Sequence, residues 1–132
     1  MRYLLDTNVF LWSIGPLRKL NQRAQNLLSQ GREEFYLSAA SAWEITIKSA
    51  TGKLQLPEPP ERLVPNGVRA LGLRPLPITQ LHTLAVGSLP PHHQDPFDRI
   101  LIAQARSEDM ILMTTDHLLS KYPVQTLWCG KA

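Results

Sequence analysis

The stretch Met1–Trp12 reads MRYLLDTNVFLW and places a carboxylate where an apolar strand should end. Tyr3–Leu5 predicts a short buried strand, and apolar residues resume after Asn8. Asp is depleted in strands, and a charge near a core costs free energy unless it is paired or binds a metal. Two interpretations follow. Either Asp6, Thr7 or Asn8 caps the next helix, or Asp6 belongs to a functional site.

The composition is that of a globular protein. The chain has 132 residues, of which 43% are hydrophobic and 19% charged, and this predicts a single domain over 1–132. No apolar run approaches the roughly 20 residues of a membrane span, and no signal-peptide pattern is present. The lone Cys129 cannot form an internal disulfide. We therefore expect a cytoplasmic protein without a membrane partner, and its net charge of +3 slightly favours a polyanionic partner.

Predicted strands and helices alternate along the chain. Strands are expected at 3–6, 35–37, 110–114 and 124–127, with a proline-broken edge strand within 73–78. Helices are expected at 8–14, 22–30, from Ser38 or Ser41 to 51, 60–71, 79–87, 96–109 and 116–122. This alternation predicts an α/β fold with a central, mainly parallel sheet flanked by helices.

The helix that ends near residue 51 has an apolar stripe at helical spacing. Ala40, Trp43, Ile47 and Ala50 make up this stripe, which we expect to face the core. Gly52 follows the last turn and is typical of a helix C-terminus.

Four acidic residues fall at equivalent places in this predicted fold. Asp6 ends the first strand, Glu44 lies early in the helix after the second, and Asp116 follows the strand 110–114. Asp98 lies in the first turn of the helix that leads into that strand. Functional sites of open parallel sheets form beyond the carboxyl ends of the strands. All four side chains can therefore face one crevice.

Each acid also has a purely structural interpretation. Asp6 and Asp116 can be helix caps, and Asp98 can stabilise a helix N-terminus. Glu44 and Lys48 are spaced i,i+4, as in a solvated ion pair. These interpretations do not explain the shared location. Clustered carboxylates repel unless a cation holds them, and oxygen ligands suit Mg²⁺ or Mn²⁺, ions that promote phosphodiester hydrolysis.

Several motifs carry a family resemblance that spans nearly the whole chain. LLDTNVFLW, SAWEITIKSATGKL, HHQDPFDRILIAQA and MTTD resemble the motifs of PIN-domain ribonucleases. They are most similar to the VapC-like toxins of bacterial toxin–antitoxin pairs. The resemblance implies a PIN domain with strand order 3-2-1-4-5. It also implies a metal-dependent endoribonuclease that cleaves RNA, is inhibited by a cognate antitoxin and forms a homodimer.

The resemblance also suggests roles for individual residues. The catalytic and metal-binding acids of the family correspond to Asp6, Glu44, Asp98 and Asp116, with Mg²⁺ or Mn²⁺ as cofactor. The polar residues near the metal correspond to Asn8 and Thr114. Within DPFDR, Asp95-Pro96 has the pattern of a cap followed by the first helical residue, so we assign Asp98 to the metal and Asp95 to the cap. Asp95 can also lie in the layer of residues that surrounds the metal ligands without contacting the metal.

Basic residues beside these acids are candidates for RNA contact. Lys48 lies one turn from Glu44, and Arg99 adjoins Asp98, although ion pairing with the acids explains them equally well. His92 or His93 can also touch RNA phosphate, while a zinc site is disfavoured because adjacent histidines usually point apart. The main alternative function is a non-catalytic PIN-fold module that binds RNA or protein.

Two other protein classes, a phosphatase that begins with a strand ending in Asp and a signalling domain that gathers acids around magnesium, are excluded by single positions. A haloacid-dehalogenase-like phosphatase needs a second Asp where this chain has Asn8. A phosphorelay receiver domain needs an Asp at the end of a middle strand, where this chain has Ser38-Ala39-Ala40.

Overall fold

The computed structural model describes residues 1–92 and 94–131, and within them the chain forms a five-stranded parallel sheet in the order β3-β2-β1-β4-β5. The strands are β1 (Arg2–Leu5), β2 (Glu34–Ser38), β3 (Arg74–Leu76), β4 (Ile111–Thr114) and β5 (Thr126–Trp128). The α-helices are α1 (Thr7–Ser13), α2 (Gln22–Gln30), α3 (Ala39–Ala50), α4 (Pro60–Leu71), α5 (Gln80–Ala85) and α6 (Pro96–Ser107). Short 3₁₀ helices lie at η1 (Leu17–Lys19), η2 (Val86–Ser88) and η3 (His117–Lys121). The predicted α/β fold and strand order are confirmed.

Strand β1 is the centre of the sheet and fixes its polarity. Leu5 is in register with Leu37 of β2 on one side and with Met113 of β4 on the other. Because all the strands are parallel, their carboxyl ends meet along one edge of the sheet. The backbone N–H of Asp6 donates to the carbonyl of Met113 at 2.9 Å and extends this pairing one residue beyond β1. Asp6 therefore lies at the middle of the edge where functional sites form in this class of fold.

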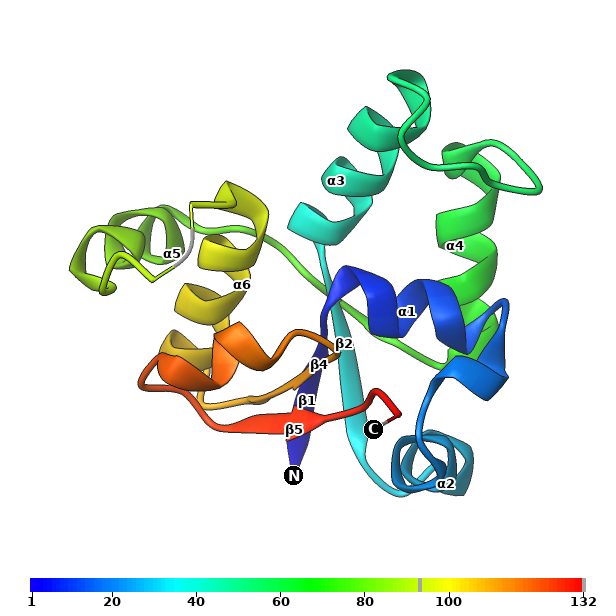
Figure 1. Ribbon diagram of the computed structural model, residues 1–132, viewed down its shortest axis with the longest axis horizontal. Coiled ribbons are helices and arrows are strands. Elements are labelled where there is room, and N and C mark those ends of the chain that lie inside the picture. The colour runs from blue at the N-terminus through cyan, green and yellow to red at the C-terminus, as the bar shows by residue number, and fades with distance from the viewer. Residues whose placement is uncertain (93, 132) are drawn as a thin grey trace.

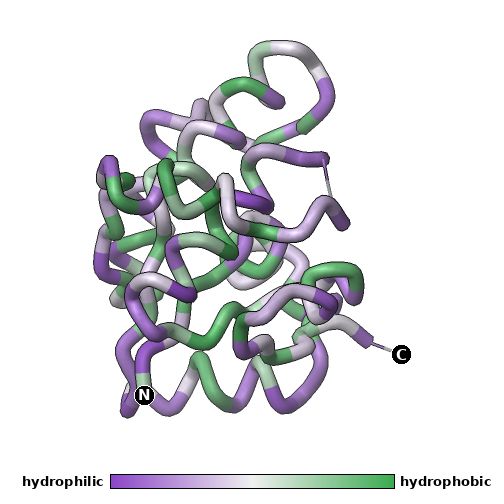
Figure 2. Tube along the Cα trace, turned by 90° about the vertical axis from the view of Figure 1, so that its left-hand side faces the viewer, coloured by the Kyte–Doolittle hydropathy of each residue, from purple (hydrophilic) through white to green (hydrophobic). Residues whose placement is uncertain are grey.

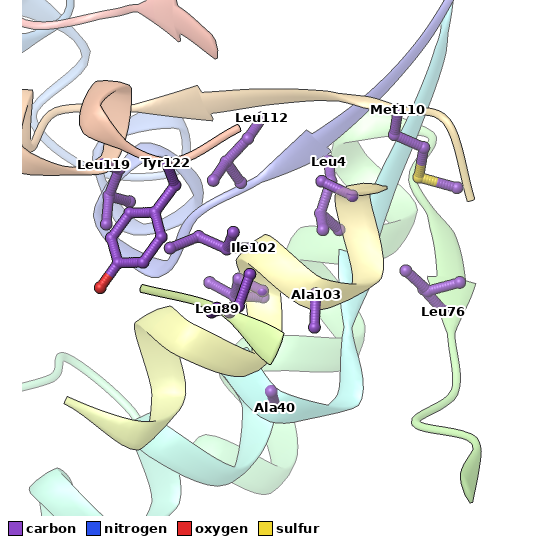
Figure 3. Close-up of a cluster of buried hydrophobic side chains, with 12 residues drawn as sticks. Leu4, Ala40, Leu76, Leu89, Ile102, Ala103, Met110, Leu112, Leu119 and Tyr122 are labelled. Carbon is purple, nitrogen blue, oxygen red and sulfur yellow. The ribbon is translucent and has the colours of Figure 1, made fainter. Parts of the chain in front are cut away.

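Successive residues of the central strands face opposite layers of helices. Leu4 and Leu112 pack with Ile102 of α6 in one core, which Figure 3 shows from the side of that helix. Leu5 and Met113 belong to a second core on the other face of the sheet. In Figure 1, α5 and α6 lie to one side of the strands and α1, α2 and α4 to the other. The alternation is the period-two pattern of a strand buried on both faces.

Local capping residues set most of the helix boundaries that the sequence predicts. The Asn21 side chain accepts from the N–H of Ala24 and starts α2, and Thr79 starts α5 in the same way. Ser38, one of the two candidates, caps α3. The short helix predicted for 116–122 is present as the 3₁₀ helix η3, with Asp116 as its N-cap. The helix η1 was not predicted at all.

The predicted core stripe of α3 is wrong for every member except Ala40, which is buried. Trp43 and Ile47 are 59% and 38% exposed, whereas Ser41, Glu44 and Ile45 are buried. Helix α3 is thus turned so that a carboxylate points inward. Helical spacing identified an apolar stripe, but the buried face is decided by partners on α1 and α6 that spacing does not reveal.

Hydrophobic and hydrophilic residues are interspersed along the chain, as Figure 2 shows for the helices and loops around the sheet. Among the described residues, no helix combines the length and the apolar character needed to cross a bilayer.

Candidate active site

Asp6 is a helix cap, and it also lies at the centre of the carboxyl edge of the sheet, which we call the acidic edge because Glu44, Asp98 and Asp116 lie on the elements around it. It is the N-cap residue of α1, and its Oδ1 accepts from the N–H of Val9 at 2.8 Å. Its Oδ2 accepts from the N–H of Thr115 at 3.2 Å. The side chain is only 5% exposed. Asp6 thereby connects the end of β1 to the segment that follows β4.

The environment of Asp6 disfavours its charged form. Burial, with a smaller contribution from the neighbouring Glu44 carboxylate, raises the pKa of Asp6 to about 6. Hydrogen bonds from the side chain of Thr114 and from the N–H groups of Val9 and Thr115 oppose this rise. The site therefore contains a poorly solvated carboxylate that would gain from a nearby cation.

Glu44 reaches the same region from α3 and is held through both of its oxygens. Its Oε1 accepts from the hydroxyl of Thr7 at 2.5 Å, and its Oε2 accepts from the ammonium of Lys48 at 2.5 Å. The hydroxyl of Ser41 lies 3.1 Å from that of Thr7. Glu44 is 6% exposed, so these partners are what makes its burial tolerable.

Lys48 connects the Glu44 carboxylate to the acids of α6. The hydrogen bond to Glu44 raises the pKa of Lys48, and the charges of Glu44, Asp95 and Asp98 act in the same direction against partial desolvation. Asp95 and Asp98 therefore lie within electrostatic reach of this ammonium. The edge-to-face contact of Trp43 with Phe97, at 5.1 Å between ring centroids, packs α3 against the first turn of α6.

The assignment of Asp95 as the cap of α6 is confirmed. Its Oδ1 accepts from the N–H of Phe97 at 2.8 Å and from that of Asp98 at 3.4 Å. Asp98 itself is half-buried in the first helical turn. On the same helix, Leu101 and Ile102 are fully buried and anchor α6 against the sheet.

Asp116 joins the site through Thr114. Its carboxylate caps η3 by accepting from the N–H of Leu118 at 2.9 Å. Its own N–H donates to the hydroxyl oxygen of Thr114 at 3.0 Å, and the Thr114 side chain is also hydrogen-bonded to Asp6. The end of β4 thus places Asp116 and Asp6 around one buried hydroxyl.

Thr7 is a site residue that the sequence analysis missed as a partner of Glu44. It is buried and contacts Glu44, whereas Asn8 is exposed and lines a separate hollow of about 250 Å³ with Leu11 and Leu63. The i,i+3 spacing of Ser41 and Glu44 shows that both share one helix face. A hydroxyl on that face is the sign that could have indicated a buried Glu44 in need of partners.

The other basic and aromatic candidates have varied surroundings. The guanidinium of Arg99 donates to the backbone carbonyls of Pro90 at 3.0 Å and Val86 at 3.3 Å, so it supports the loop before α6. Its contact with RNA stays a prediction. His92 is exposed and its ring contacts Tyr122, while His93 lies outside the described residues.

The donors at this edge have the chemistry of a Mg²⁺ or Mn²⁺ site. All are oxygens, each carboxylate oxygen can accept more than one partner, and the ammonium of Lys48 already occupies the position of a cation on Glu44. Within residues 1–92 and 94–131, no three His, Cys, Asp or Glu side chains are gathered closely enough to share an ion. The donor types therefore fit the metal, although these described side chains are not gathered around a single point.

The PIN domain family model matches residues 3–125, almost the whole chain. This chain belongs to the PIN domain family. One similar protein is ribonuclease VapC16 of Mycobacterium tuberculosis, which is 48% identical over 52 residues. That stretch is 39% of this PIN domain and spans only 37% of the relative.

Solved structures with the same fold include two toxin–antitoxin chains. VapBC2 of Rickettsia felis, bound to a DNA fragment from its promoter, gives a TM-score of 0.74 at 16% identity, covering 96% of this chain and 98% of that one. DNA-bound VapBC of Salmonella typhimurium gives 0.67 at 14% identity, with 96% and 97% covered. At such low identity these structures support the fold of the PIN domain and nothing finer.

Proposed function

We propose that this PIN domain is a metal-dependent endoribonuclease that hydrolyses RNA phosphodiester bonds in the cytoplasm. The observation that carries the proposal is the buried carboxylate of Asp6 at the centre of the carboxyl edge of the sheet, with further acids on the elements that border this edge. The charge of Glu44 raises the pKa of Asp6, and Glu44 is hydrogen-bonded to Lys48. The charge of Asp98 in turn raises the pKa of Lys48. A chain of interacting charges therefore runs from β1 through α3 to α6.

In this proposal the four acids Asp6, Glu44, Asp98 and Asp116 hold Mg²⁺ or Mn²⁺. The ion supplies Lewis acidity and lowers the pKa of a bound water. Asn8, Thr114 and Asp95 belong to the surroundings of these ligands.

The chain itself orients the ligands. The N–H groups of Val9 and Thr115 fix both oxygens of Asp6, so this carboxylate needs little reorganisation to bind a cation. The hydroxyl of Thr7 fixes one oxygen of Glu44. Lys48 is 38% exposed, so its ammonium can attract RNA phosphate at the mouth of the site, and Arg99 is a second candidate for this role.

The test is cleavage of a labelled single-stranded RNA with manganese, with magnesium and with chelator. Asp6→Asn, Glu44→Gln, Asp98→Asn and Asp116→Asn should each abolish cleavage, because the amide keeps the shape of the side chain and loses the charge that binds the cation. Asp109→Asn is the matched control, because Asp109 is exposed and has a positive φ of 55° that Asn tolerates.

The outcome also tests the assignments within DPFDR. Full activity of Asp98→Asn with loss in Asp95→Asn would reverse the roles given to these two acids. RNA binding without cleavage under any metal condition would favour the alternative, a non-catalytic module. The ion pair between Glu44 and Lys48 is the observation that keeps this alternative open, because a cation already neutralises one of the proposed ligands.

We further propose that the chain is the toxin of a toxin–antitoxin pair and works as a homodimer. The proposal is supported by the similarity to a protein named ribonuclease VapC16 and to chains solved in VapBC complexes. Sedimentation of the purified chain tests the dimer. Expression alone and together with candidate antitoxins tests inhibition, since a cognate antitoxin should restore growth and co-purify with the chain.

A further inference from the structure

A second hollow lies beside the acidic edge and is lined by side chains of a different kind. It encloses about 530 Å³. Its lining combines three cations with two indoles: Arg18, Lys19, Lys131, Trp12 and Trp128. We call it the Trp12–Trp128 pocket. Its volume falls within the roughly 300–1,000 Å³ of pockets that take small ligands or single groups of larger ones.

Thr115 joins this pocket to the candidate active site. It lines the pocket, and its backbone N–H donates to Oδ2 of Asp6 at 3.2 Å. The pocket and the candidate active site are therefore only one residue apart, within reach of a single bound polymer.

Hydrogen bonds from Asn21 join the two segments that form the walls of the pocket. The side-chain amide of Asn21 donates to the carbonyls of Trp128 and Gly130, each at 3.0 Å. The backbone N–H of Asn21 donates to the carbonyl of Cys129 at 2.8 Å. The η1 segment, which carries Arg18 and Lys19, is thus tied to the chain after β5. The pocket is part of the fold and does not depend on two separate mobile loops.

Neighbouring side chains and backbone fix the orientation of both indole rings. Trp128 stacks on His117 with 3.5 Å between ring centroids and 17° between planes. Its far edge lies over Gly130, where a Cβ would come within 2.7 Å of the indole, so only glycine permits this arrangement. Lys19 holds its ammonium 5.4 Å from the centre of the Trp12 ring. Fixed aromatic faces next to cations are the features that bind single-stranded nucleic acid.

The charge of the pocket also points to an anionic polymer. Among the described residues, no salt bridge pairs Arg18, Lys19 or Lys131 with a carboxylate. Three cations without such partners, around one hollow, create a positive potential directly beside the acidic edge. An apolar protein segment would leave these charges desolvated and unpaired, whereas phosphates neutralise them.

We propose that the Trp12–Trp128 pocket binds the nucleotide of single-stranded RNA that adjoins the bond held at the carboxylates. The base stacks against the indoles, and the flanking phosphates are bound by Arg18, Lys19 and Lys131. This inference rests on the proposed ribonuclease function and deepens it, because it names the part of the chain that holds the substrate next to the reacting bond.

Salt dependence of RNA binding tests the phosphate contacts. Binding of a short labelled single-stranded RNA is measured in chelator, where no cleavage occurs, over a range of salt. Arg18→Ala/Lys19→Ala should make the slope of log K against log salt shallower by about 1.4, since each single-strand phosphate contact contributes about 0.7. The matched control is Arg32→Ala/Arg106→Ala, which removes the same charge from exposed side chains and should leave the slope unchanged.

Abasic substitution tests the stacking. Replacing the bases of the RNA one at a time should reveal one position where affinity falls about tenfold, a typical loss for one stacked base. Trp12→Leu should remove this sensitivity, and a thermal melt verifies that the variant is folded. Trp43→Leu is the control, because Trp43 is exposed on α3 away from the pocket lining, and it should keep the sensitivity.

The outcomes separate this inference from the proposed function. RNA binding with these responses but no cleavage when metal is restored contradicts the ribonuclease and leaves the pocket assignment standing. Cleavage by a chain whose Arg18→Ala/Lys19→Ala variant keeps the wild-type slope and abasic profile overturns the pocket assignment alone. It is also overturned if the wild type binds no single-stranded RNA at low salt, or if the variant loses a protein partner while RNA binding stays intact.

Discussion

Replacing Asp6 by Asn should make the metal-free protein more stable at neutral pH. Burial, helped by the charge of Glu44, raises the pKa of Asp6 from 3.8 to about 6. The folded state therefore holds this proton more tightly than the unfolded state. The resulting contribution to stability is present below the unfolded pKa and is lost as pH rises through about 6. A rise in pKa of this size corresponds to roughly 3 kcal/mol of unfolding free energy lost at neutral pH.

The amide should recover most of this free energy. Asn is as good a helix cap as Asp, so the hydrogen bond from the N–H of Val9 is retained. The amide NH₂ would face the N–H of Thr115, and the lost hydrogen bond costs about 1 kcal/mol. The net gain is about 2 kcal/mol, or a melting temperature higher by roughly 6–8 °C for a chain of this length.

Thermal melts in chelator, at pH values from mildly acidic to mildly alkaline, measure this effect. The advantage of Asp6→Asn over wild type should be small in acid and should grow as pH rises through about 6. Asp109→Asn serves as control because it makes the same exchange at an exposed position. Parallel pH profiles of wild type and Asp6→Asn would refute the reasoning, since the carboxylate would then carry no penalty for burial.

Manganese provides a second readout of the same substitution. An ion that binds only the folded state adds about 2.7 kcal/mol at 100 times its dissociation constant. The wild type should therefore gain stability on addition of manganese, and Asp6→Asn should gain much less. Equal metal responses in the two proteins would mean that Asp6 is a helix cap and not a metal ligand.

Other side chains of the site and the fold give further expectations. Lys48→Ala should destabilise the metal-free protein by about 1 kcal/mol in a urea melt, because the nearly buried Glu44 loses its cation. If the variant also shows a shallower salt dependence of RNA binding, Lys48 contacts an RNA phosphate as well. Arg99→Ala should lower the free energy of unfolding by roughly 2 kcal/mol in a urea melt, because it removes the charged donor to loop carbonyls such as that of Pro90. An unchanged melt would show that Arg99 does not stabilise this loop. Gly67→Ala should cost about 1–2 kcal/mol despite better helix propensity, because the new Cβ would lie 2.8 Å from the Phe10 ring, and equal or higher stability would show that the ring moves freely.

Much of the fold could be predicted from the sequence because helix caps and strand hydrophobicity depend on residues close together in the chain. Asn21, Thr79 and Asp95 each cap a helix with their own side chain, so the helix starts depend on residues adjacent in sequence. The strands β1 and β4 are apolar on both faces, as parallel strands covered by helices must be. The 3₁₀ helix η1 has only three residues, too few to show a helical period, and it lacks a side-chain cap.

The site was only partly readable because burial on α3 is a tertiary property. The spacing of Trp43 and Ile47 matched a core stripe, yet the buried face is the adjacent one. That face carries Glu44, whose burial depends on the hydroxyl of Thr7, a residue 37 positions earlier in the chain. A single-helix pattern cannot contain that information. The acids that end strands were easier to identify, since the order of strands and helices alone places them at one edge.

The two interpretations of Asp6 are compatible, because the geometry that makes its carboxylate a helix cap also suits the metal-binding role proposed for it. One oxygen starts α1 through Val9, and the other binds Thr115 beyond β4, so capping is what fixes the carboxylate at the centre of the edge. Thr115 also lines the Trp12–Trp128 pocket. The same backbone amide thus positions the charge proposed to bind metal and one wall of the pocket proposed to bind RNA. A cap that served only the helix would have no reason to be buried at a cost in stability, and a cation at this edge would offset that cost.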